Sequence, residues 1–162
     1  MATFNSNIDA LVAAPTDYSC HLDITSNITG IALVTTNIDW TRDQLDAQDM
    51  HNLSTNPDRI YMPLAGMWCF HWHFRSTNAS CSAQGWITHY SSSDVGLRDT
   101  FGYTGVRNAE QVVFVNCTDP GNATDQSSEY VVVKAWITAG DLEAGTVAVR
   151  AFHMPGASRL AL

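Results

Sequence analysis

The eight residues from Met67 to Phe74 alternate between two kinds of side chain with a period of two. Successive side chains of a β-strand point to opposite faces, so this segment is expected to form a strand with two different faces. One of those faces is entirely aromatic and carries Trp68, Phe70, Trp72 and Phe74. Each aromatic side chain can bury about 150–250 Å² of surface. The sequence therefore predicts that this face lines the interior between two packed sheets.

The opposite face of the same segment carries Met67, Cys69, His71 and His73. These residues suit neither a hydrophobic core nor a solvated surface, which favours contact with another subunit. The Cys-x-His-x-His spacing also offers three metal ligands. A single strand, however, holds such ligands far apart for one tetrahedral ion, and zinc sites usually draw on two elements. We therefore favour plain packing or a subunit interface here, and we predict no metal.

Short segments rich in β-branched and aromatic residues, separated by turn residues, recur along the rest of the chain. Strands are expected at residues 21–25, 30–36, 59–62, 66–74, 84–90, 111–115, 130–138, 146–153 and 158–162. Many short strands of this kind are typical of an all-β sandwich or barrel. A helical period is present at most over residues 40–50, and this acidic stretch is predicted to be a long ordered loop. Residues 1–17 are predicted to form an N-terminal arm, and residues 18–162 a single domain.

The charge and hydropathy of the 162-residue chain argue against several classes of partner. Sixteen acidic residues against eight basic ones give a net charge of −8, and the basic residues do not cluster. The electrostatic footprint of a nucleic-acid-binding protein is therefore missing. No apolar run approaches the ~20 residues that cross a bilayer, and the first residues lack the features of a signal peptide. We expect a protein made in a cytoplasm, with no membrane partner and with four reduced, buried cysteines.

Sequence motifs that carry catalysis are missing. There is no Gly-x-Ser-x-Gly elbow, and neither a phosphate-binding loop, a dinucleotide glycine pattern nor a His-Glu-x-x-His motif occurs. Two acidic stretches, residues 39–49 and 119–125, offer oxygen ligands but lack the spacing of a calcium loop. We therefore predict a protein that is not an enzyme, with no catalytic residue and no cofactor.

A strand, a proline, a small-residue turn with glycine and an aromatic strand follow one another from Asn56 to Phe70 (Asn-Pro-Asp-Arg-Ile-Tyr-Met-Pro-Leu-Ala-Gly-Met-Trp-Cys-Phe). This order resembles the C1q/TNF-like family, and the Ala139-Gly140-Asp141 turn is similar to that family's late turn. The segments at residues 49–51 and 54–56 resemble its bacteriophage branch. The resemblance covers residues 31–90 and 130–162. The His71 and His73 pair and the insertion at residues 143–145 depart from the family pattern.

The resemblance implies an antiparallel jelly-roll sandwich that assembles as a homotrimer, with the aromatic strand's sheet lining the three-fold axis. It further implies a structural virion protein of a tailed bacteriophage, synthesised in the host cytoplasm. We favour a homotrimeric decoration protein on the outer capsid surface, partnered by the major capsid protein or another virion protein and anchored by the N-terminal arm.

Two alternatives stay open. The first is a tail-tip or fibre receptor-binding protein, in which loop aromatics would stack on sugars; the candidates are Trp40, Tyr90, Phe101 and Tyr103. The second is a non-viral carbohydrate- or protein-binding module.

Overall fold

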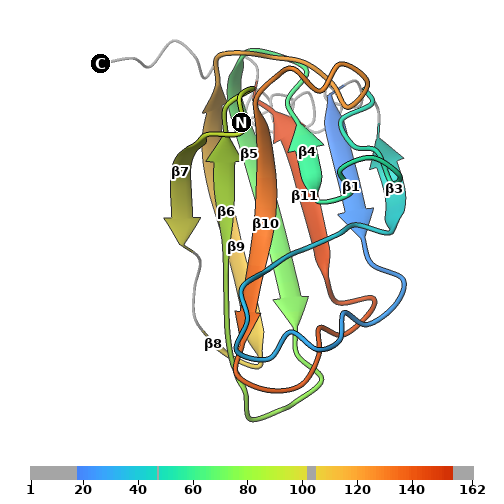
Figure 1. The fold of residues 1–162 in the computed structure, drawn as a ribbon, viewed down its shortest axis with the longest axis vertical. Coiled ribbons are helices and arrows are strands. Elements are labelled where there is room, and N and C mark those ends of the chain that lie inside the picture. The colour runs from blue at the N-terminus through green and yellow to red at the C-terminus, as the bar shows by residue number, and fades with distance from the viewer. Residues whose placement is uncertain (1–17, 47, 102–104, 155–162) are drawn as a thin grey trace, which may run out of the picture.

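The computed structural model describes residues 18–46, 48–101 and 105–154, which form two β-sheets packed face to face (Figure 1). The predicted N-terminal arm, Tyr103 and the strand expected at residues 158–162 lie outside the described residues. The described part of the chain contains strands and no helix, and so holds no helix that could span a membrane. Every paired strand runs antiparallel to its neighbours. The predicted all-β antiparallel sandwich is confirmed.

The first sheet has five strands in the order β3 (Arg42–Asp46), β1 (Ser19–Asp23), β11 (Ala148–His153), β5 (Gly66–Arg75) and β9 (Asn108–Cys117). The second sheet has the order β2 (Thr36–Asn37), β10 (Tyr130–Ile137), β6 (Ser82–Tyr90) and β7 (Gly96–Phe101), while β4 (Arg59–Tyr61) pairs with β10 and β8 (Gly105–Val106) pairs with β6. Strands β9, β10 and β11 alternate between the two sheets, so sheet neighbours come from distant parts of the chain.

The aromatic face of β5 fills the space between the sheets, as its alternation predicts. Trp68, Phe70 and Trp72 are fully buried, and Phe74 is 2% exposed. The Trp72 and Phe74 rings stack with their centroids 5.5 Å apart. On the facing sheet, Gly85 in β6 leaves room for this stack, because a Cβ atom there would lie 2.5 Å from both rings. Glycine inside a strand here marks a close approach of side chains to the backbone.

The structure corrects one of the strands expected from sequence. Residues 30–36 do not form a strand: Gly30 and Leu33 have φ angles of 72° and 63°, so the chain turns. Only a bridge from Ala32 to Ile137 and the short β2 remain. The β-branched composition of residues 30–36 therefore did not produce a strand, because the chain turns here as it passes from the first sheet to the second.

Residues 40–50 are also not the predicted loop, since they contain β3 at the edge of the first sheet. The edge strand β7 was not expected either. Both strands carry more charged and polar side chains than the inner strands do, although Leu45 and Leu97 are exposed on them. Charged side chains are the usual means of protecting a sheet edge from further pairing. An alternating hydrophobic pattern is therefore a weak guide to them.

Candidate subunit interface

The outward-facing side of the five-stranded sheet, here called the outer face, carries side chains that the strand register aligns in three rows. The first row is Ser19, Phe152, Cys69 and Phe114; the second is Leu45, His21, Arg150, His71 and Val112; the third is Arg42, Asp23, Ala148, His73 and Glu110. Directly opposed side chains in paired strands lie close enough to interact. The outer face therefore combines an apolar end with an end rich in histidine.

The apolar end of the outer face is exposed to a degree unusual for such large side chains. Phe114 is 53% exposed, Val112 51% and Phe152 39%, and Leu45 at the other edge of the sheet is 47% exposed. Met67 is half-buried, whereas Cys69 between the two phenylalanines is only 5% exposed. Contiguous apolar side chains on a soluble domain mark an interaction site. At this end of the sheet, both faces of β5 and β9 are thus largely apolar, as expected of a sheet that is covered on two sides.

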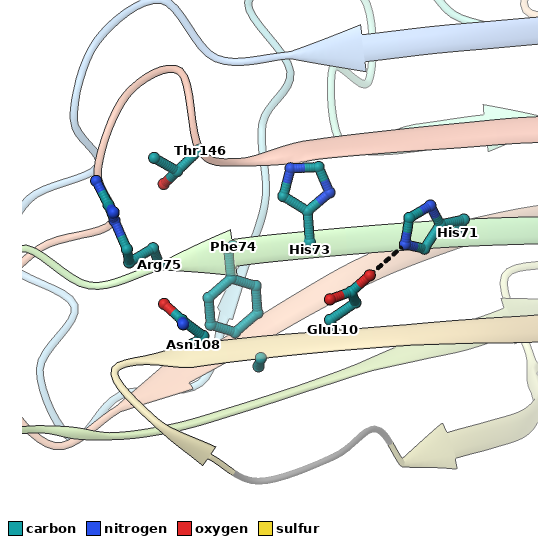
Figure 2. A pocket seen from close by; sticks show the side chains of 8 residues that line it. His71, His73, Phe74, Arg75, Asn108, Glu110 and Thr146 are labelled. Atoms are coloured by element: carbon teal, nitrogen blue, oxygen red, sulfur yellow. Dashed lines mark hydrogen bonds and ion pairs between the residues drawn. The ribbon is translucent and has the colours of Figure 1, made fainter.

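The histidine end of the outer face surrounds a hollow of about 420 Å³ (Figure 2). His71 and His73 project from β5 into it, with ring centroids 5.9 Å apart. The Nε2 atom of His71 lies 2.7 Å from Oε1 of Glu110 on β9. Burial lowers the pKa of His73 below its ordinary value of 6.5, and the neighbouring charges of His71, Arg150 and His21 lower it further, against the attraction of Glu110. This environment therefore favours the neutral imidazole form of His73.

The described residues contain no group of three or more His, Cys, Asp and Glu side chains placed to hold a metal ion. Carboxylates in the acidic stretch after residue 39 form hydrogen bonds with other residues of the chain. Asp43 contacts Nδ1 of His51 at 2.8 Å, and Asp46 accepts hydrogen bonds from the backbone of Met50 and His51. Asp49 accepts a hydrogen bond from the hydroxyl of Thr124. These carboxylates hold the 40–50 segment against its neighbours.

The predicted sugar-binding aromatics do not gather on one exposed surface of the described chain. Trp40 is 1% exposed, so its prediction as a surface residue is wrong. Its backbone N–H donates to the carbonyl of Pro57, and the next N–H, of Thr41, donates to that of Asp23. These bonds tie the loop across the sandwich and turn the indole into the core.

The other aromatic candidates remain without support as a sugar-binding set. Tyr90 is half-buried, stacks on Tyr130 with centroids 5.0 Å apart, and accepts a hydrogen bond from Lys134. Phe101 ends β7, and Tyr103 lies outside the described residues.

The prediction of Met67, Cys69, His71 and His73 as interface residues stays a prediction, but the structure shows that all four lie on the outer face. The two exposed phenylalanines of the outer face, Phe114 and Phe152, were not identified from sequence. They come from two strands separated by more than 30 residues, and only the register places them on either side of Cys69. The continuous apolar run of residues 112–115 was the available signal, because a half-exposed strand would alternate.

The order of the strands in the two sheets defines a jelly roll of the C1q/TNF-like type. No family model matches the chain, and no curated protein matches it in sequence. Among solved structures it is similar to murine APRIL, a TNF-family protein, in crystals at pH 8.0, with a TM-score of 0.56 and 8% identity over 85% of this chain and 98% of that chain. The pH 5.0 crystal structure of the same protein gives a TM-score of 0.55 and 9% identity over the same shares. The globular domain of zebrafish complement 1qA protein gives 0.49 and 12% over 85% and 95%. The likeness to APRIL shows the fold.

Proposed function

We propose that three copies of this chain pack around a three-fold axis through their outer faces, and that the trimer is a structural decoration protein on a bacteriophage capsid. The observation that carries the first part is the exposed apolar end of the outer face, with Phe114 and Val112 both more than half exposed. A second copy of the same chain is the occupant that we assign to it.

The edge of the second sheet supplies a surface that such a trimer needs. Closed rings are built from heterologous contacts, in which one surface of each copy meets a different surface of the next. Besides the outer face, exposed apolar side chains lie along the β7 and β8 edge, with Val95 and Leu97 at one end and Val106 at the other. A face and an edge on each copy allow the ring to close. The C1q/TNF-like fold is consistent with a trimeric domain.

The virion role is supported by the sequence rather than by the site. Residues 49–51 and 54–56 resemble the bacteriophage branch of the C1q/TNF-like group, and an acidic, lightly charged chain suits the outside of a particle. In this proposal the trimer binds the major capsid protein or another virion protein, with residues 1–17 as the anchor.

The oligomeric state tests the first part of the proposal. Native mass spectrometry and sedimentation equilibrium of the full chain at pH 7.5 should give about 53 kDa, three times the 17.7 kDa chain mass. Phe114→Asp should give a folded monomer, because it would bury a charge in the interface at a cost of several kcal/mol. The matched control is Leu53→Asp, since Leu53 is 45% exposed in a loop outside the strands of the five-stranded sheet. A monomeric wild type, or a trimeric Phe114→Asp variant, would refute the trimer.

The copy number per particle tests the virion role. Quantitative mass spectrometry of purified particles that encode this chain should find hundreds of copies against the major capsid protein. A handful of copies, in multiples of three, would move the protein to the tail or a fibre. Its absence from the particles would remove the virion role and leave a non-viral binding module.

A further inference from the structure

We infer that acidic pH dissociates the trimer while leaving the subunit folded, because His21 and His73 gain charge on the outer face, beside Arg150 and His71. This inference rests on the proposed function, since it concerns the regulation of the same interface. The strand register places three of the chain's six histidines, His21, His71 and His73, on this one sheet surface.

The strand register brings the three histidines to one arginine. In the second row, His21 on β1 is paired with Arg150 on β11, and Arg150 is in turn paired with His71 on β5. His73 lies one position further along β5 on the same face, with its ring 5.9 Å from that of His71. Arg150 is exposed and carries its charge at every relevant pH. Each protonated histidine would therefore join an existing positive charge.

The negative charges on this surface are too few to compensate. Asp23 is already paired with Arg42, whose Nε and Nη2 atoms lie 2.7 and 2.5 Å from its two oxygens. Glu110 contacts His71 at 2.7 Å and can offset one histidine of the pair on β5. The charged and titratable groups that face this surface are His21 and Asp23 on β1, Arg42 on β3, Arg150 on β11, Cys69, His71, His73 and Arg75 on β5, and Glu110 on β9. Arg75 is paired with Glu143 at 2.6 Å, and Asp43 and Asp46 turn towards His51 and its backbone.

Two of these histidines already resist protonation in the single chain. Burial, followed by the charges of His71, Arg150 and His21, lowers the pKa of His73, and burial followed by Arg150 lowers that of His21. Packing a second copy over the outer face would remove more water and lower both values further. A group whose pKa is lower in the trimer than in the monomer favours the trimer at pH values above the pKa that the group has in the monomer. That contribution is lost as the pH falls, so acid favours dissociation.

The size of the effect follows from the number of protons taken up. His21 and His73 together give six such groups in a trimer. If packing lowers each pKa by one further unit, full protonation weakens the trimer association constant by about 10⁶-fold. Because this constant scales with the square of the chain concentration, the concentration at which half of the trimer dissociates would rise about 10³-fold.

The test is sedimentation equilibrium of the full chain from pH 7.5 to pH 5.0, with circular dichroism on the same samples. We expect trimer at pH 7.5 and folded monomer at pH 5.0. The His21→Gln/His73→Gln variant should stay trimeric at pH 5.0. The control variant is His153→Gln, because His153 lies on the other side of β11 against Trp68 and should behave like the wild type.

The outcomes separate the two proposals. A wild type that is monomeric at pH 7.5 overturns the proposed trimer and this inference with it. A trimer that persists at pH 5.0, or a double variant that dissociates as the wild type does, overturns the pH inference alone. Loss of the circular dichroism signal in step with dissociation also overturns it, because acid would then act on the fold.

Discussion

Replacing Gly85 with alanine should destabilise the subunit, although glycine to alanine in a strand is ordinarily favourable. A Cβ atom at this position would lie 2.5 Å from Cη2 of Trp72 and 2.5 Å from Cε1 of Phe74. Carbon atoms in contact are normally about 3.5–4.0 Å apart, so both rings would have to move by about 1 Å. Trp72 is fully buried, Phe74 is 2% exposed, and the two rings stack on each other, so neither has free space to move into. Overpacking of this kind typically costs about 1–3 kcal/mol.

Thermal and urea unfolding at a fixed chain concentration would measure this cost, because oligomers unfold in a concentration-dependent way. A loss of about 2 kcal/mol corresponds to a fall of about 4–8 °C in the unfolding midpoint of a domain this size. Gly96→Ala in β7 is the matched control, since a Cβ there meets Thr88 and Tyr90 only at 3.9 Å. That control should be neutral or slightly stabilising.

A second substitution identifies the source of the cost. Trp72→Phe removes the indole atoms nearest to the new Cβ, so Gly85→Ala should cost less in that background than in the wild type. Equal midpoints for Gly85→Ala and Gly96→Ala would show that the aromatic stack yields freely and would refute the packing argument.

Two further predictions concern buried titratable groups. Glu129→Gln should cost about 1.5–3 kcal/mol at pH 7, because the carboxylate accepts hydrogen bonds from the Thr118 hydroxyl at 2.6 Å and the Thr118 N–H at 3.0 Å. Burial raises the Glu129 pKa, but the bonds from Thr118 and the contact with His89 outweigh it and lower the pKa below 4.5. The ionised Glu129 carboxylate therefore stabilises the fold fully above its unfolded-state pKa of 4.5, and this stabilisation is lost as the pH falls through the lower folded-state pKa. The urea midpoint of the Glu129→Gln variant should therefore change less between neutral and acid pH than that of the wild type. All four cysteines are free and buried, and burial is the main cause that raises the pKa of Cys117 to about 12. At pH 8, a disulfide-exchange reagent should therefore react slowly with the native protein, and in urea it should label four thiols per chain. Rapid labelling of the native protein would contradict this burial.

The alternation of the segment around Trp72 was enough to predict a strand with a buried aromatic face, and the structure confirms it. The prediction succeeded because side-chain direction in a strand is a local property of the backbone. The polar strands β3 and β7 and the burial of Trp40 were beyond this argument. Whether such a segment forms a strand or is buried depends on the distant segment with which it pairs. For example, the backbone N–H of Trp40 donates to the carbonyl of Pro57, and no local sequence pattern relates these two residues.

The candidate subunit interface was likewise predictable from the sequence only in part. By itself, the sequence determined that one side of the segment from Met67 to His73 is neither core nor solvated surface. Only the tertiary structure decided that Phe114 and Phe152 flank Cys69, and that Arg150 lies between His21 and His71. The physical reason is register: antiparallel pairing aligns side chains from strands far apart in the chain. The register of each strand pair is set by the packing of the whole two-sheet core rather than by any one segment.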